Sequence, residues 1–67
     1  MKLSYTTESF RKRYEPFQGA FYEHGLYRIF EPSHNTSRWL IYHGRERLSQ
    51  ASDYLEAIYK INRFRGV

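Results

Sequence analysis

The stretch "RWLIYHGRER", residues 38–47, decides most of the fold because it has the pattern of a β-strand followed by a turn. In a strand, side chains alternate between two faces, so Trp39 and Ile41 point one way while Leu40 and Tyr42 point the other. A half-buried strand normally has one apolar row and one polar row, but each row here carries an aromatic side chain. We therefore expect both faces of this strand to make contacts.

A second stretch, "GAFYEHGLYRIFEP" (residues 19–32), contains two extended runs separated by Gly25. Gly44 follows the strand of the first stretch in the same way, and glycine suits the positive φ that tight hairpin turns require. Pro32 ends the second run, and the polar loop "SHNTS" follows it. The pattern predicts antiparallel strands near 20–23, 26–31 and 38–43, and it leaves open a fourth strand near 45–49.

The stretch "SDYLEAIYKINRFRG", residues 52–66, has the pattern of an amphipathic helix. Ser52 is a favourable N-cap, and Gly66 is a favourable residue for the C-terminal end. Glu56 and Lys60 have the i, i+4 spacing of a stabilising pair. We expect a helix over 52–65. Its apolar arc consists of Tyr54, Leu55, Ala57, Ile58, Ile61 and Phe64.

One helix covers only one face of a sheet, so the two faces of this sheet need different partners. The bulkier and drier row is expected beneath the helix and consists of Tyr27, Ile29, Trp39 and Ile41. The opposite row is expected to remain open and consists of Arg28, Phe30, Arg38, Leu40 and Tyr42. In the alternative, the N-terminal segment folds over that second face with Phe10, Tyr14 and Phe17.

The N-terminal stretch "MKLSYTTESFRKRYEPF", residues 1–17, predicts a short helix or a basic arm. Thr6 or Thr7 can cap such a helix, and Pro16 would end it. Leu3, Phe10, Tyr14 and Phe17 have the spacing of one helical stripe. Arg11, Lys12 and Arg13 then face solvent or contact a phosphate backbone. The predicted fold is α+β: a three- or four-stranded antiparallel sheet, a C-terminal helix on one face and a short N-terminal helix.

Size and composition limit the classes of protein to which the chain can belong. Its 67 residues predict one small domain, 1–67, with the sheet at 19–50. The chain has no cysteine, and no apolar run has the length of a membrane span or signal peptide, so we expect a cytoplasmic protein. The net charge is +4, and eight of the eleven basic residues are arginine, which favours bidentate contacts with phosphate or carboxylate.

Motifs for catalysis, metals or cofactors are absent from the sequence. There is no phosphate-binding loop, dinucleotide fingerprint or nucleophile elbow. His24, His34 and His43 fall in predicted turns or loops, with spacings that match no zinc site. The one enzyme-like grouping combines His43, Arg45 and Arg47 with Tyr42. We expect a protein without enzymatic activity, catalytic residues, metal, cofactor or small-molecule substrate.

The order of elements resembles that of DNA-binding domains built from a three-stranded sheet and a helix. These include the arm-binding domain of phage tyrosine integrases and the plant AP2 domain. The resemblance rests on "AFYEHGLYRIFEP", "RWLIY" and "DYLEAIYKINRF", about two thirds of the chain. It implies a sheet that enters the major groove, with Arg28, Arg38 and Tyr42 as the residues that contact DNA. The chain departs from these families at Glu23 and Glu31 and in the extra segment "RERLS".

The sequence thus predicts a small binding module whose partner is nucleic acid, with DNA favoured over RNA, and not a membrane. Short, aromatic, self-contained chains of this type are also common among phage-encoded inhibitors, including anti-CRISPR proteins, and membership of that class would imply stoichiometric binding to a host protein or nucleoprotein complex in the host cytoplasm. Arginine and tyrosine serve both kinds of interface. The predicted contact residues are Arg11, Lys12, Arg13, Arg28, Phe30, Arg38, Tyr42, Arg45 and Arg47.

Overall fold

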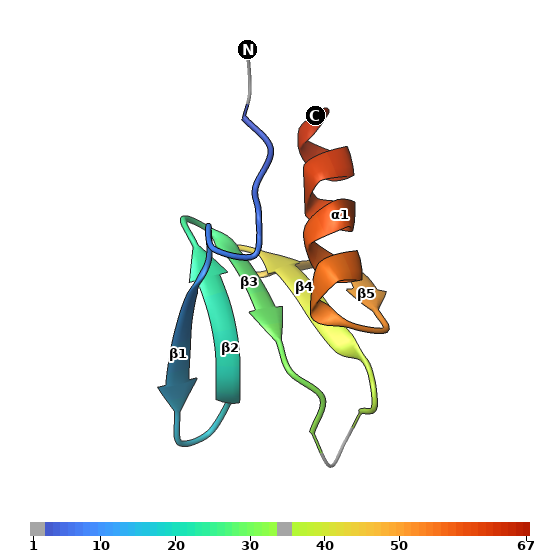
Figure 1. Ribbon diagram of the computed structural model, residues 1–67. Coiled ribbons are helices and arrows are strands. Elements are labelled where there is room, and N and C mark those ends of the chain that lie inside the picture. The colour runs from blue at the N-terminus through green and yellow to red at the C-terminus, as the bar shows by residue number, and fades with distance from the viewer. Residues whose placement is uncertain (1–2, 34–35) are drawn as a thin grey trace.

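The computed structural model describes residues 3–33 and 36–67 and shows one antiparallel sheet with a helix after it (Figure 1). The sheet has five strands, which lie side by side in chain order. The elements are β1 (Arg11–Glu15), β2 (Gly19–His24), β3 (Tyr27–Phe30), β4 (Trp39–His43), β5 (Glu46–Ala51) and α1 (Tyr54–Arg65). The α+β class and the C-terminal helix are confirmed, whereas the predicted count of three or four strands is too low. The predicted loop position of His34 lies outside the described residues.

The two glycine turns lie where the sequence predicts them. Gly25 has φ 59° between β2 and β3, and Gly44 has φ 63° between β4 and β5. Each is the first residue of a two-residue hairpin connection, a position that favours glycine because L side chains rarely adopt positive φ. The Gly25 turn fixes the register in which Glu23 lies opposite Arg28, and the Gly44 turn fixes that in which Tyr42 lies opposite Arg47.

The predicted N-terminal helix is wrong, because the basic segment forms strand β1. β1 pairs with β2 from Arg11 opposite Glu23 to Glu15 opposite Gly19. Pro16 does not end a helix but occupies a hairpin turn, in which the Gln18 amide donates to the Glu15 carbonyl at 3.2 Å. Short isolated helices are marginal in water, so pairing along the free edge of β2 outweighs the local helical pattern.

The predicted helical stripe of the N-terminal segment is absent as well. Phe10 is buried at 7% exposure, but Leu3, Tyr14 and Phe17 are exposed. Phe10 joins the core beneath α1, whereas Tyr14 lies on β1 and Phe17 at the tip of the β1–β2 hairpin. The N-terminal segment therefore does not close the second face of the sheet.

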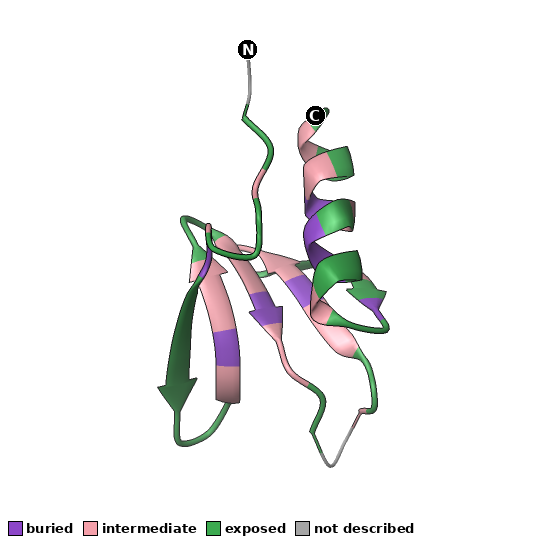
Figure 2. Cartoon of the chain, viewed as in Figure 1, coloured by how far each residue is buried: buried purple, intermediate pink, exposed green. Residues whose placement is uncertain are grey.

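The core lies between α1 and one face of the sheet, as predicted (Figure 2). Ile29 and Ile41 are fully buried there, and Tyr27 and Trp39 pack against them. The helix contributes Ala57, Ile58 and Ile61, whereas Leu55 and Phe64, which were expected in the same arc, are exposed. The other members of this core are Phe10 and Ala51.

Both ends of α1 are capped. The N-cap is Asp53 and not the predicted Ser52, because the Asp53 carboxylate accepts the Glu56 amide at 2.8 Å. The Glu56 carboxylate accepts the Ser52 amide at 2.7 Å. The Lys60 ammonium donates to the Gln50 carbonyl. Glu56 and Lys60 therefore bind other partners and do not form the predicted i, i+4 pair. Gly66 ends the helix in the left-handed conformation, as predicted.

The N-terminal segment runs along α1, from Leu3 beside Arg65 to Thr7, whose carbonyl accepts a hydrogen bond from the Tyr54 hydroxyl at 3.0 Å (Figure 1). The Asn62 side chain binds the backbone of Tyr5, and Arg65 binds the carbonyl of Leu3. This contact places the N-terminal segment on the helix side of the sheet. In the described part of the chain, no helix has the length and apolar content needed to cross a membrane.

Candidate functional site

The face of the sheet that points away from α1 has no covering element. Across β2, β3 and β4, Phe21 lies opposite Phe30, and Phe30 lies opposite Leu40. One step along, Arg28 lies opposite both Glu23 and Tyr42. Directly opposed residues in an antiparallel sheet point to the same face, so this open face carries aromatic and charged side chains together.

The open face contains a small apolar cluster of its own. Phe21 is 2% exposed although it lies on the side away from the helix. Its ring stacks on that of Phe30 with centroids 5.1 Å apart, and the rings of Phe30 and Tyr42 form a T-shaped pair with centroids 5.5 Å apart. The two apolar rows of the sheet thus have different partners: one row contacts α1, and the other forms this cluster.

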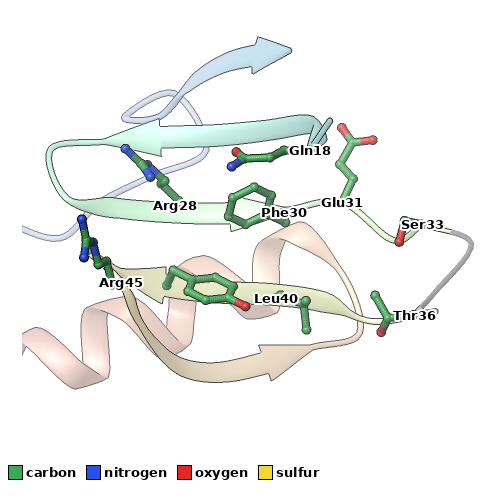
Figure 3. Close-up of a pocket in the computed structure, with 10 residues that line it drawn as sticks. Gln18, Arg28, Phe30, Glu31, Ser33, Thr36, Leu40 and Arg45 are labelled. Atoms are coloured by element: carbon green, nitrogen blue, oxygen red, sulfur yellow. The ribbon is translucent and has the colours of Figure 1, made fainter. Parts of the chain in front are cut away.

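A hollow with a cavity volume of about 460 Å³ lies over this cluster. Figure 3 shows Arg28 and Arg45 at one end of it and Glu31, Ser33 and Thr36 at the other. The hollow is also lined by Gln18, Phe30, Leu40, Tyr42 and Gly44. The hollow therefore has an aromatic floor, a basic end and a polar end with one carboxylate.

Glu23 holds two of the predicted contact residues in ion pairs. Arg28 Nε lies 3.0 Å from Glu23 Oε2, and an Arg13 guanidinium nitrogen lies 3.0 Å from Glu23 Oε1. The hydrogen bond from Arg28, followed by that from Arg13, lowers the pKa of the Glu23 carboxyl below its ordinary value. Arg13 and Arg28 therefore lie on the open face with part of their charge neutralised.

Lys12 is directed away from the open face. It lies opposite Tyr22, with its ammonium 5.7 Å from the Tyr22 ring centroid and 3.4 Å from the Glu31 carboxylate. The charge of Glu31 raises the pKa of the Lys12 ammonium. The structure thus separates Lys12 from the other predicted contact residues because successive residues of a strand face opposite sides.

Within the described ranges 3–33 and 36–67, four arginine side chains have no ion pair or hydrogen bond. These are Arg11, Arg38, Arg45 and Arg47. Arg45 lines the hollow, and Arg47 lies opposite Tyr42 on the neighbouring strand. Arg11 lies opposite Glu23 on β1. Arg38 is exposed but precedes β4 and does not line the hollow.

The pairing of β4 with β5 has one irregularity, directly after Arg47. The register shifts between Ile41, which lies opposite Ser49, and Tyr42, which lies opposite Arg47. The extra residue is Leu48, which packs against the helix-side core. Because of this bulge, β5 supplies both Leu48 and Ala51 to the helix-side core, with Ala51 opposite Trp39, while Arg47 keeps the hairpin register opposite Tyr42.

The enzyme-like grouping of the sequence is not brought together. Tyr42 lies on the open face, whereas the His43 ring packs on the helix side, 4.6 Å from the Tyr27 ring and 6.1 Å from that of Phe64. His24 meets the Ser9 carbonyl at 3.0 Å. Among the residues that the structure describes, no three histidine or acidic side chains form a group that could hold a metal ion.

Sequence reasoning missed several residues of the open face and of the hollow. Phe21 shares the open row with Phe30, and the alternation of "GAFYEH" could have indicated this. Gln18, Ser33 and Thr36 come from turns and loops, where no periodic pattern predicts direction. Four predicted contact residues do line the hollow: Arg28, Phe30, Tyr42 and Arg45.

Comparisons with known proteins gave no relative: no family model, curated protein or solved structure matches this chain.

Proposed function

We propose that the protein is a non-enzymatic nucleic-acid-binding module that uses the open face of its sheet. The observation that carries this proposal is the aromatic pair Phe30 and Tyr42 beside Arg45 and Arg47, whose guanidinium groups have no acidic partner in the described ranges. Aromatic rings next to free cations match the two parts of a nucleotide, the base and the phosphate.

The charge distribution supports a polyanionic partner. Arg11, Arg45 and Arg47 keep their charge available, while Arg13 and Arg28 share Glu23 between them. A phosphate that approaches Arg28 finds its guanidinium already oriented by Glu23, since a bonded side chain loses less rotational freedom on binding. We propose DNA in preference to RNA, on the resemblance described above.

A salt titration of binding tests the proposal. Fluorescent DNA and RNA of random sequence are titrated with the protein at several salt concentrations. The logarithm of the affinity should fall with the logarithm of salt concentration, with a slope of about −0.9 per phosphate contacted on duplex DNA. Arg45→Ala and Arg47→Ala should each flatten the slope by about one contact.

Arg63→Ala is the matched control, because it removes the same charge from the outer side of α1. It should leave the slope nearly unchanged. If the wild-type protein binds neither DNA nor RNA at low salt, the proposal is wrong. If Arg45→Ala and Arg63→Ala change the salt slope equally, binding depends on net charge only, and the open face is not the binding surface.

A second candidate function is inhibition of a host protein, and a different surface favours it. Leu55 and Tyr59 are exposed one helical turn apart on α1, and the Arg63 guanidinium lies 5.8 Å from the Tyr59 ring centroid one turn further on. Tyr and Arg are enriched among the residues that dominate protein interfaces, and the i, i+4 spacing of this row is that of a helix that binds in an apolar groove. A nucleic-acid backbone would gain nothing from contact with the apolar side chains of this row.

The double variant Leu55→Ser, Tyr59→Ser separates the two functions. An inhibitor that uses α1 should form a complex of shallow salt dependence with a host protein, and this variant should abolish that complex. The same variant should bind DNA like the wild type if the open face carries the function. Loss of DNA binding in this variant, with its fold intact, would contradict the assignment of the open face.

A further inference from the structure

We infer that the hollow on the open face accepts an unpaired base of a single-stranded nucleic acid, with the adjoining phosphate at the end formed by Arg28 and Arg45. This inference rests on the proposed function and specifies its substrate class. It follows from the shape of the site, the chemistry of its floor and the charges at its two ends.

The floor of the hollow requires a partner with an exposed flat face. Phe30 and Tyr42 are half-buried side chains that line the hollow together with Leu40. In a duplex, the faces of each base are covered by its neighbours, and only edges and phosphates are accessible. A base that is unpaired and unstacked can lay its face on aromatic side chains, which is how single strands are commonly bound.

The size of the hollow fits this partner. Its volume of about 460 Å³ lies in the range of pockets that hold small ligands, so it can take one nucleotide but not the width of a duplex. The buried Phe21 ring stacks on Phe30 with ring centroids 5.1 Å apart and so supports the floor from within the sheet. A preformed floor reduces the entropy lost when a base settles on it.

The charges at the ends orient the nucleotide. Arg28 and Arg45 attract a phosphate at one end, whereas the other end has the Glu31 carboxylate, which is paired with Lys12, and the polar residues Ser33 and Thr36. Thr36 and Gln18 place polar groups around the base position. Arg47 lies opposite Tyr42 on β5 and is placed to contact the next phosphate along the strand. The strand would thus follow the open face with Tyr42 beneath one base.

Four matched oligonucleotides test this inference: a single-stranded DNA, the RNA of the same sequence, the DNA duplex, and a DNA strand of equal length whose sugars carry no bases. The single strands should bind at least about tenfold more tightly than the duplex or the abasic strand, because only they offer a base face. Comparison of the affinities for the single-stranded DNA and for the RNA of the same sequence shows which of the two the site prefers.

The Tyr42→Ala variant should weaken binding to the single strand by about five- to 150-fold, the range expected for the loss of one base–aromatic stack. Its salt slope should stay unchanged, because no phosphate contact is lost. Tyr42→Phe should retain wild-type affinity, and Tyr59→Ala on α1 serves as the control for loss of an exposed aromatic. Tyr42→Leu keeps an apolar side chain in place if Tyr42→Ala fails to fold, and it should still lose the stacking contribution.

A fluorescent base analogue, 2-aminopurine, gives a direct readout, since stacking on an aromatic ring quenches its emission. Quenching should occur with the wild type and with Tyr42→Phe, and it should be lost with Tyr42→Leu. Equal affinity for the abasic strand or the duplex would overturn this inference and leave the proposed function intact. Absence of binding to all four oligonucleotides would overturn both.

Discussion

The side-chain amide of Asn62 pairs with both backbone polar groups of Tyr5. Its Oδ1 accepts the Tyr5 amide at 2.8 Å, and its Nδ2 donates to the Tyr5 carbonyl at 3.0 Å. The Arg65 guanidinium carbon lies 3.6 Å from the Tyr5 ring centroid, and Arg65 also donates to the Leu3 carbonyl at 2.7 Å. One helical side chain thus acts as the hydrogen-bonding partner that a neighbouring strand would otherwise provide.

Asn62→Ala should destabilise the protein by about 1–3 kcal/mol, because it leaves the Tyr5 backbone groups without their partner. Urea denaturation measures the loss, and amide exchange at Tyr5 should accelerate. Arg63→Ala, at the adjacent exposed position, should change stability by less than about 0.5 kcal/mol. Unchanged exchange at Tyr5 in Asn62→Ala would show that this contact does not hold the N-terminal segment.

Ile58→Ala should cost about 2–5 kcal/mol of unfolding free energy, since it opens a cavity between α1 and the sheet. Ile58 is 5% exposed, whereas Leu55, one turn earlier on the helix, is 66% exposed. Leu55→Ala should therefore change stability by no more than about 0.5 kcal/mol. Equal losses in the two variants, measured by denaturant titration, would contradict the packing of α1.

The ion pairs of Glu23 make stability depend on pH in the acidic range. Arg28 and Arg13 hold the folded-state pKa of Glu23 below its ordinary value of 4.5, so the unfolded chain binds a proton more readily than the folded one. The stabilisation that these ion pairs provide is fully present above pH 4.5, and it is lost as the pH falls through the lowered pKa of Glu23. Glu23→Gln should remove this part of the acid slope, and Glu15→Gln, at an exposed position, should retain it.

Glu23→Gln also tests the charge balance of the proposed interface. It frees Arg13 and Arg28, so affinity for DNA at low salt should rise, and the salt slope should steepen by about 0.9 for each new phosphate contact on duplex DNA. Glu15→Gln changes the net charge equally. If both variants raise affinity by the same factor, net charge rather than the release of the two arginines is responsible.

The protein should lose stability at high pH because of the partly buried phenol of Tyr54. Burial, followed by the neighbouring Tyr22, raises the pKa of the Tyr54 phenol above its ordinary value of 10.0. The folded state therefore resists ionisation, and stability should fall as the pH rises from 10.0 towards the raised pKa. Tyr54→Phe should flatten this fall, whereas Tyr59→Phe, at an exposed position, should leave it unchanged. Denaturation curves across the alkaline range measure both.

The middle of the fold could be predicted from the sequence because local patterns and tertiary packing agree there. Ile29 and Ile41 alternate with open-face residues, and Gly25 and Gly44 mark the turns between strands. β1 could not be predicted in this way. Its residues have helical spacing, and Pro16 suits a helix end as well as a hairpin turn. Pairing with β2 is therefore what makes this segment a strand.

The candidate site was predictable only in part for a similar reason. Phe30 and Tyr42 follow from strand alternation, whereas Lys12 was misplaced because its strand was not recognised. Ion pairing of Arg28 with Glu23 depends on cross-strand register, which no single stretch of sequence contains. The loop residues Gln18 and Thr36 reach the hollow only through the path of the folded chain.

The contact between Tyr5 and Asn62 has a consequence for the order of folding. Every strand of the sheet pairs with the next one along the chain, but Tyr5 and Asn62 are 57 residues apart. Contacts that close long loops cost more chain entropy and tend to form late, after local hairpins. Asn62→Ala should therefore accelerate unfolding and leave the folding rate nearly unchanged in stopped-flow kinetics. The Tyr5–Asn62 contact would then determine how long the native state persists, not how quickly it is reached.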